Sequence, residues 1–194
     1  MLITYLVIAY LIGTFPSGLI ISKFYKVDIT KEGSGNTGAT NIARTLGKKA
    51  GIFTLLIDTL KGILAVVLAK NFCLDDRYHF IIAFIVVLGH CFSIPKVFKG
   101  GKGVATGLGA LIALNYLFAV VGLLTFAVVF YFSKIVSISS IAAVIIIPIF
   151  GLIYGLNYQL ITILLAISLL IAYRHSENIQ RLIKGEEKKF VLKK

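Results

Sequence analysis

The stretch that decides the fold is VATGLGALIALNYLFAVVGLLTFAVVFYF, residues 104–132. It is apolar almost throughout, and a single helix of this length would far exceed a hydrocarbon core of ~30 Å. If it is divided at Asn115 and Tyr116, it gives two short spans that tilt or stop short of the full core. The choice matters because it changes the number of membrane crossings in the chain by one.

The remaining sequence is similarly apolar, with 58% hydrophobic and 14% charged residues among 194 and a mean hydropathy of +0.96. A soluble domain of this size could not bury so much apolar surface, and the continuous runs exclude the alternating strands of a β-barrel. We expect one domain, residues 1–194, with an all-α fold: a polytopic transmembrane helical bundle. The apolar runs are 2–22, 52–69, 80–95, 104–116, 117–132, 136–154 and 157–173.

Charge placement predicts the topology. Lysine and arginine gather in segments 23–50 and 96–102 and in the tail from Arg174, which places all three in the cytoplasm. Two spans are then needed within 104–132, because one would leave the tail outside. The expected bundle has seven spans, its N-terminus outside and its C-terminus in the cytoplasm. Residues 1–23 lack a basic leader region and a cleavage site, so we interpret them as an uncleaved span.

The first polar island, residues 33–41, matches G-x-G-x-x-G. It is no dinucleotide fingerprint, because no strand precedes it and no βαβ unit fits here. Its glycines still let backbone N–H groups approach a phosphate. Neutral side-chain donors add to them: Ser34, Asn36, Thr37, Thr40 and Asn41. The alternative is an ordinary glycine-rich turn.

The second and third islands are basic. Residues 99–103 read KGGKG, which offers two ammonium groups, a flexible backbone and the N-terminus of a helix starting at Val104. It is not a Walker loop, because Gly103 stands where Ser or Thr is required. In the third island His175, Asn178 and Arg181 recur every third residue and so share one helix face. The alternatives are a positive-inside anchor for the second island and a solvated tail helix for the third.

Other polar residues have two interpretations each. Asp58 and Lys61, inside the second span, either pair at i, i+3 or face a substrate. The serines at the start of the sixth span either donate to the site or cap the helix: Ser137, Ser139 and Ser140. We interpret His79 as interfacial and His90 as structural in preference to catalytic. Cys73 and Cys91 are too far apart on one helix to pair, and two lone thiols predict no metal site.

Taken together, the islands resemble the motifs of the bacterial acyl-phosphate:glycerol-3-phosphate acyltransferase family of the inner membrane. The resemblance runs from end to end: GTFPS at 13–17, GSGNTGATNIAR at 33–44, Asp58-x-x-Lys61-Gly62, GH at 89–90, FKGGKGVAT at 98–106, and RHSENIQRLIKGEE at 174–187. It implies transfer of a fatty acyl group from acyl phosphate to the 1-hydroxyl of glycerol 3-phosphate. The products are lysophosphatidic acid and phosphate, in the first acylation of phospholipid synthesis.

The resemblance also implies the setting. We expect a multi-pass protein of the bacterial cytoplasmic (inner) membrane with its active site on the cytoplasmic face, in contact with membrane lipid. It implies no cofactor, no metal and no nucleic-acid partner, and a functional link to the enzyme that makes acyl phosphate. Because acyl phosphate is already activated, no covalent nucleophile is needed, and the sequence has no G-x-S-x-G elbow.

The resemblance and the chemistry of the islands together give the expected site. Four residues are expected to be catalytic: Ser34, Lys102, His175 and Asn178. Glycerol 3-phosphate is expected to bind Arg44, Lys102, Ser140, His175, Asn178 and Arg181. Acyl phosphate is expected to bind Ser34, Gly35, Asn36, Thr37, Gly38, Thr40, Asn41, Gly100, Gly101 and Gly103. Either His175 or the donor phosphate takes the proton.

Two other functions fit the sequence less well. A transporter or flippase of phosphate esters would suit a bundle with a basic mouth, but the polar groups gather at one face and no inverted repeat is visible. An acyltransferase using acyl-CoA or acyl carrier protein would need a site for the nucleotide or the carrier, and the sequence offers no sign of one.

Overall fold

The apolar runs form helices in the computed structural model, which describes residues 2–72, 75–93 and 100–190. Within these ranges the helices are α1 (Leu2–Thr14), α2 (Ser17–Phe24), α3 (Ala39–Leu46), α4 (Lys48–Phe72), α5 (Asp76–Cys91), α6 (Val104–Leu114), α7 (Tyr116–Ser133), α8 (Val136–Tyr154), α9 (Tyr158–Arg174) and α10 (Ser176–Ile183). Cys73 and part of the second island, Lys99 included, lie outside the described residues.

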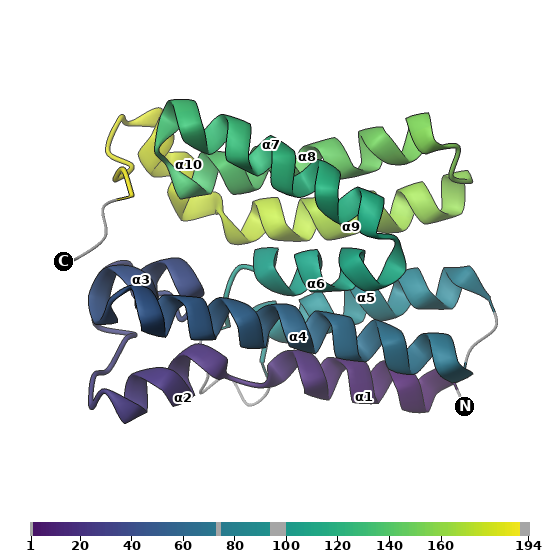
Figure 1. The fold of residues 1–194 in the computed structure, drawn as a ribbon, viewed down its shortest axis with the longest axis horizontal. Helices are drawn as coiled ribbons and strands as arrows, with labels where there is room; N and C mark the ends of the chain where they lie inside the picture. Colours follow the sequence, from purple (N-terminus) through teal and green to yellow (C-terminus); the bar gives the residue numbers. More distant parts are fainter. Residues whose placement is uncertain (1, 73–74, 94–99, 191–194) are drawn as a thin grey trace.

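Two groups of helices run side by side along the long axis (Figure 1). Helices α1–α5 form one group and α7–α10 the other, with short α6 between them. Helix α4 packs on α6, α1 on α5, and α7 on α8, while α9 contacts both α5 and α8. The largest apolar core joins α1, α4, α5, α6 and α9, and Val86, Val87 and Ile171 are central to it.

The predicted division of 104–132 is confirmed. Helix α6 ends at Leu114 and α7 begins at Tyr116, and the Asn115 side chain caps α7 by accepting a 3.0 Å hydrogen bond from the Leu117 N–H. The first apolar run is divided into two helices at Phe15 and Pro16, although Leu2–Phe24 as a whole is long and apolar enough to cross a bilayer, in agreement with the interpretation of residues 1–23 as a span. Proline lacks an N–H and disfavours helical geometry in the residue before it, which explains the break.

Helix α6 is short and lies very close to α4. A Cβ on Gly109 would fall 1.9 Å from the Thr59 carbonyl oxygen, and one on Gly62 would fall 2.1 Å from that of Thr106. Each of these glycines therefore allows one backbone to rest on the other. The result is a recessed α6 that lies deeper than its neighbours α4 and α7.

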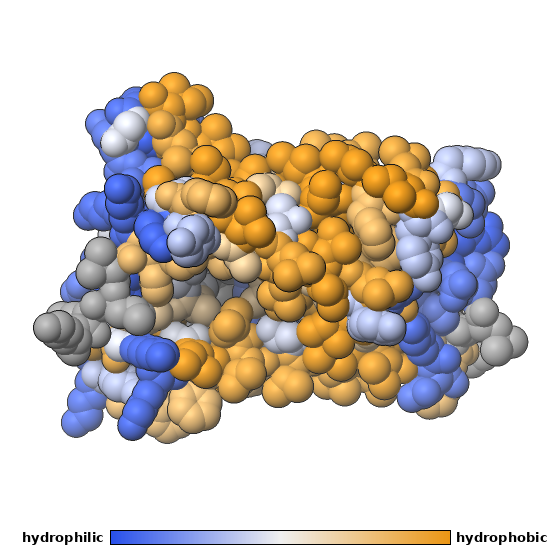
Figure 2. All heavy atoms as spheres, turned by 45° about the horizontal axis from the view of Figure 1, so that its top comes forward, coloured by the Kyte–Doolittle hydropathy of each residue, from blue (hydrophilic) through white to orange (hydrophobic). Residues whose placement is uncertain are grey.

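On the face shown in Figure 2, apolar residues cover the middle of the molecule and polar residues gather at both ends. Among the described residues four helical stretches are long and apolar enough to cross a bilayer, or five if the bent α9–α10 pair counts as one span. Helices α5 and α6, with 16 and 11 residues, fall below that length. The fold is therefore all-helical over these residues and suited to a membrane, while seven crossings and their orientation remain predictions.

Candidate functional site

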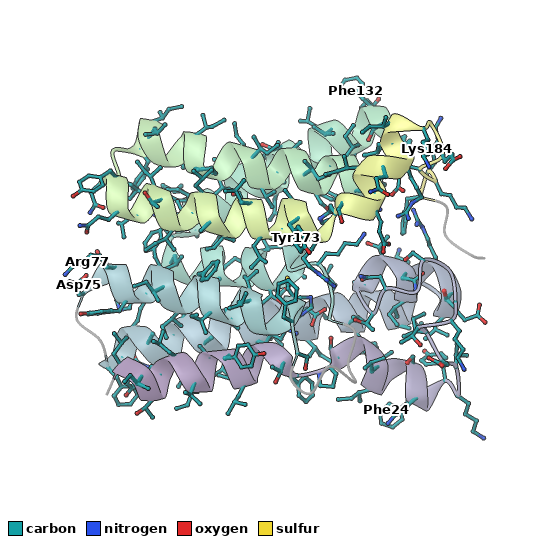
Figure 3. The ribbon with its side chains drawn as sticks, turned by 180° about the vertical axis from the view of Figure 1, so that it is seen from behind. Phe24, Asp75, Arg77, Phe132, Tyr173 and Lys184 are labelled. Carbon is teal, nitrogen blue, oxygen red and sulfur yellow. The ribbon has the colours of Figure 1, made fainter. Side chains whose placement is uncertain are left out.

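The three polar islands meet at one end of the bundle, around a cavity of about 1030 Å³. This end carries α2, α3, α10 and the C-terminal segment, and Phe24 and Lys184 mark it in Figure 3, opposite Asp75 and Arg77. A hollow between the α3–α4 side and the α7 side is visible in Figure 2. The islands are distant in sequence, so the helices that carry them bring them together.

The first island is a self-supporting loop. Asn41 is buried, and its Oδ1 accepts from the Ser34 N–H at 3.0 Å while its Nδ2 donates to the carbonyls of Glu32 and Asn36 at 3.0 and 2.9 Å. The Asn36 Oδ1 accepts from the Gly38 N–H at 2.8 Å. The two asparagine amides therefore fix the loop's shape, and two of its N–H groups are used within it.

The chain then enters a helix that the sequence analysis did not foresee. Helix α3 begins at Ala39, directly after Gly38 at the N-cap, and carries Thr40, Asn41 and Arg44. These three residues line the cavity, as do Ser34, Asn36 and Gly38. Gly35 does not line it. A polar helix of eight residues is hard to distinguish from a loop by hydrophobic pattern alone.

The second island is held by its backbone. Arg174 donates from Nη2 to the Gly100 carbonyl at 3.0 Å and from Nε to the Gly101 carbonyl at 3.2 Å. The Gly101 N–H donates to the His90 carbonyl at 3.1 Å. Gly103 adopts the left-handed region at φ +88° and serves as N-cap of α6. Lys102 thus projects from a fixed turn, and it lines the cavity together with Gly103.

Besides the two hydrogen bonds from Arg174, a bond between side chains connects the third island to the second. The Lys102 ammonium donates to Oδ1 of Asn178, and both residues line the cavity. Burial is the main reason that the pKa of Lys102 is lowered to about 8, and the Arg181 charge lowers it further. Lys102 therefore remains largely cationic at neutral pH but loses its charge more readily than an ordinary lysine.

His175 has a defined tautomer in this arrangement. Its Nδ1 lies 2.8 Å from the Ile171 carbonyl oxygen, which can only accept, so Nδ1 carries the proton and Nε2 is an acceptor. Burial chiefly lowers the pKa of His175 to about 4, and the nearby Lys102 charge acts in the same direction. The neutral ring lines the cavity and can accept a hydrogen bond from a hydroxyl group.

A carboxylate that the sequence analysis assigned no role connects the polar end. Glu187 accepts hydrogen bonds from Ser137 Oγ at 2.7 Å, Asn178 Nδ2 at 2.6 Å and Arg181 Nε at 2.7 Å. Burial alone would raise the pKa of the Glu187 carboxyl, but these hydrogen bonds outweigh it and the net pKa lies below its ordinary value. Its partners come from α8 and α10, so no local spacing indicates the network.

The C-terminal segment, residues 185–190, crosses from one helix group to the other. The Lys188 carbonyl accepts from Arg44 Nη2 at 3.1 Å, and the Phe190 N–H donates to the Lys134 carbonyl at 2.8 Å. The Arg44 guanidinium also lies 5.6 Å from the centroid of the Phe190 ring. Arg44 was predicted to bind glycerol 3-phosphate, and here it lines the cavity while bonded to this segment.

The three serines at the start of α8 make different contacts. Ser137 and Ser140 line the cavity, whereas Ser139 donates to the Ile135 carbonyl at 2.8 Å within its own helix. None of them caps α8, because the N-cap residue is Ile135 and no side-chain hydrogen bond is made there. The capping interpretation was therefore wrong, since the helix begins one residue before the first serine.

Most predicted site residues converge on the large cavity, but not all. It is lined by Ser34, Asn36, Gly38, Thr40, Asn41, Arg44, Lys102, Gly103, Ser140, His175, Asn178 and Arg181. Thr37, Gly100 and Gly101 instead line a small neighbouring cavity of about 20 Å³. Asp58 and Lys61 form an ion pair, with Nζ 2.9 Å from Oδ1, which was one of the two interpretations, and Asp58 also lines the large cavity.

The cavity continues from this polar end into the apolar middle of the molecule. One face of α6 lines it from Val104 to Leu114, and α7, α8 and α9 add Phe126, Ile147 and Leu164. At 1.5 Å per residue, the eleven residues of α6 extend over roughly 16 Å. The shape suits an amphipathic molecule with an anionic head and an apolar chain. Among the described residues, no group of three or more His, Cys, Asp or Glu side chains could hold a metal ion.

Comparison with known proteins gives a consistent result. Residues 3–185 match the sequence profile of a family described as glycerol-3-phosphate acyltransferase. The chain is similar to the glycerol-3-phosphate acyltransferase of Endomicrobium trichonymphae, with 45% identity over 96% of this chain and 94% of that protein. It is also similar to that of Wolbachia pipientis, with 41% identity over 96% of this chain and 97% of the other.

Solved structures agree with the sequence relatives. The fold matches crystal structures of PlsY, described as an integral membrane glycerol 3-phosphate acyltransferase. The glycerol 3-phosphate form gives a TM-score of 0.93 at 38% identity, covering 98% of this chain and 96% of that one. The lysophosphatidic acid form gives 0.90 at 38% identity, covering 98% and 95%.

Proposed function

Because the chain belongs to the glycerol-3-phosphate acyltransferase family of integral membrane enzymes, we propose that it transfers a fatty acyl group from acyl phosphate to the 1-hydroxyl of glycerol 3-phosphate. The products are 1-acyl-glycerol 3-phosphate, which is lysophosphatidic acid, and inorganic phosphate. The observation that carries the proposal is the single cavity with a cationic, donor-rich end and an apolar continuation along α6. Both substrates are phosphate esters or anhydrides, and one of them bears a long apolar chain.

Glycerol 3-phosphate is placed among the charged residues of the second and third islands. Lys102 and Arg181 supply positive charge, Asn178 contributes its amide, and Ser140 lines the same cavity. Arg44 reaches the same cavity from α3. Charge-assisted hydrogen bonds of this kind are the stronger ones in proteins, and they suit a phosphate dianion.

The acyl phosphate is placed against the first island. Ser34, Asn36 and Thr40 line the cavity with neutral donors, and Gly103 at the N-terminus of α6 lines the same cavity. Asn41 and Gly38 shape this loop from within. Thr37, Gly100 and Gly101 support the loops from the side of the small cavity. The acyl chain then follows α6 into the apolar middle of the molecule.

The chemistry requires positioning more than a reactive side chain. The glycerol 1-hydroxyl oxygen forms a bond to the acyl carbon, and the bond between that carbon and the bridging phosphate oxygen breaks. His175 Nε2 accepts the hydrogen bond of the attacking hydroxyl, which orients it, and the proton passes to the phosphate group that leaves. Lys102 stabilises the negative charge that develops on the reacting oxygens.

We also propose the membrane arrangement. Seven spans, with the N-terminus outside and the C-terminus in the cytoplasm, place the active site at the cytoplasmic face of the bacterial inner membrane. The basic segments near α3 and α10 support this orientation, because both occur at the end of the bundle that carries the cavity. Cysteine labelling tests it: a cysteine at Lys184 should react only when a reagent reaches the cytoplasmic side.

The donor is tested with purified protein, glycerol 3-phosphate and either palmitoyl phosphate or palmitoyl-CoA, following lysophosphatidic acid and phosphate release. Turnover with palmitoyl phosphate alone, unchanged by a chelator, is the expected result. Equal turnover with palmitoyl-CoA, or loss of activity in chelator, would overturn the donor assignment. Uptake of intact glycerol 3-phosphate into sealed vesicles without acyl transfer would favour a transporter.

A further inference from the structure

A buried polar cluster lies beside the break between α1 and α2 and has no role in the chemistry above. Ser17 Oγ donates to Asp58 Oδ1 at 2.7 Å, and the same carboxylate oxygen lies 2.9 Å from Lys61 Nζ. Lys61 Nζ also donates to the Phe15 carbonyl at 3.2 Å and lies 2.6 Å from His90 Nδ1. The side chains of Asp58, Lys61 and His90 are 3, 6 and 8% exposed.

The hydrogen bonds define every proton in this cluster. The Lys61 ammonium has three N–H groups, and its three partners are Asp58, the Phe15 carbonyl and His90. His90 Nδ1 therefore accepts, and its proton lies on Nε2. A buried ion pair contributes little net stability compared with apolar packing, because both charges are taken out of water. The three hydrogen bonds of the Lys61 ammonium, however, fix its position relative to Phe15, α4 and α5.

One arm of the cluster reaches the second island. His90 accepts the Gly101 N–H at its carbonyl, and its ring lies directly against the same residue, since a Cβ on Gly101 would fall 2.2 Å from Nε2. Gly101 immediately precedes Lys102 in the chain. The orientation of the His90 ring, which Lys61 sets, therefore determines where the turn that carries Lys102 can lie.

The other arm reaches the first island. Ser17, bonded to Asp58, is followed by Gly18, and a Cβ on Gly18 would fall 1.8 Å from the Thr37 carbonyl oxygen. The backbone of α2 thus rests on the backbone of the loop at Thr37. The interrupted first helix places Ser17 and the Phe15 carbonyl at the cluster, which an unbroken helix would not do.

We propose that Asp58, Lys61 and His90 are positioning residues that hold the two substrate loops in a fixed relation to each other. Asp58 acts on residues 34–41 through Ser17 and Gly18, and Lys61 acts on residues 100–103 through His90. The inference rests on the proposed function only in assigning glycerol 3-phosphate to Lys102 and acyl phosphate to residues 34–41. Displacement by about 1 Å is enough to lower a rate by roughly 100-fold.

Three variants separate the arms. The double variant Asp58→Asn/Lys61→Met removes both charges together, which avoids leaving one unpaired, and should lower kcat/KM by about 100-fold. His90→Phe keeps a ring against Gly101 but removes the acceptor, and should mainly raise the KM for glycerol 3-phosphate. Ser17→Ala should mainly raise the KM for palmitoyl phosphate. Lys70→Met is the matched control, because Lys70 is on the same helix and donates only to the Leu114 carbonyl at 3.0 Å.

Two readouts keep the test decisive. Kinetics are measured on the monodisperse folded fraction, so that loss of protein does not count as loss of rate. Hydrogen exchange of the amides in 34–41 and 100–103 is measured without substrate, and should accelerate in the double variant but not in Lys70→Met. Unchanged exchange in these loops, or a kcat/KM within about twofold of wild type, would overturn the proposal. Wild-type protein that does not turn over palmitoyl phosphate would overturn the proposed function instead, and the exchange result would still stand.

Discussion

The first and third islands both line the cavity, but they are built in different ways. The first is held by short-range hydrogen bonds from Asn36 and Asn41 to their own loop. The third depends on partners far along the chain, since Asn178 accepts from Lys102 and Glu187 accepts from Ser137. The shape of the first island thus depends mainly on hydrogen bonds within it, whereas the charged groups of the third are positioned by residues distant in the sequence.

The largest effect should come from the link between the second and third islands. Lys102→Ala should cost roughly 2–5 kcal/mol of transition-state binding, because it removes the buried cation that we assign to the substrate phosphate and leaves Asn178 without its donor. The measurement is kcat/KM with both substrates. Lys184→Ala, at the exposed C-cap of α10, is the control and should stay near wild type. Near-normal turnover of Lys102→Ala would mean that Lys102 only favours a cytoplasmic location of its loop.

Glu187→Ala should destabilise the folded protein by about 2–4 kcal/mol, because it leaves Ser137, Asn178 and Arg181 without a shared acceptor. Thermal unfolding in detergent measures this. Since the pKa of Glu187 is lowered in the fold, its contribution is present above the ordinary carboxyl pKa of about 4.3 and is lost as pH falls below it. In Glu187→Ala the thermal unfolding temperature should therefore fall less on acidification than in the wild type. If its dependence on pH were the same as in the wild type, the proposed network would be wrong.

In the first island, Asn41→Ala should weaken the binding of palmitoyl phosphate by about 1–3 kcal/mol, a smaller and more local effect. Three hydrogen bonds within the loop are lost, while the packing between helices is unchanged. We expect a higher KM for palmitoyl phosphate and little change in the KM for glycerol 3-phosphate. Thr45→Ala, a neighbour on α3, serves as control. If both Michaelis constants rose equally, the two islands would not be as independent as their hydrogen bonds indicate.

The smallest effect is that of pH on Lys102. Because its pKa is lowered to about 8, kcat/KM for glycerol 3-phosphate should fall by up to about tenfold for each pH unit above that value. A guanidinium stays charged over this range, so Lys102→Arg should flatten the alkaline limb even if it lowers the rate. His175, with a pKa of about 4, should contribute no titration near neutrality. An alkaline limb that persists in Lys102→Arg would assign it to another group.

The helices were largely predictable because apolar runs and the polar pair at 115–116 are local signals. Pro16, which interrupts the first run, is also a local signal and lies in the GTFPS stretch at 13–17. Most residues at the polar end of the cavity were predictable, because clusters of small and basic residues are rare in this chain. Glu187 and Arg174 were not assigned roles, since their partners lie elsewhere in sequence: Ser137 for one and the carbonyls of 100–101 for the other. Asn41 was predicted to bind acyl phosphate, whereas its side-chain amide donates hydrogen bonds to carbonyls of its own loop.

The recessed α6 has a consequence for how the protein is made. Eleven residues are too few to enter a bilayer independently as a spanning helix, and the face that meets α4 presents Gly109 to the Thr59 carbonyl. During synthesis α4 emerges from the ribosome first, so it is already available as a docking surface when α6 follows. We therefore expect the insertion of α6 to depend on α4. A bulky residue at Gly62 or Gly109 should lower the amount of folded protein in the membrane more than it lowers the activity of the molecules that do fold.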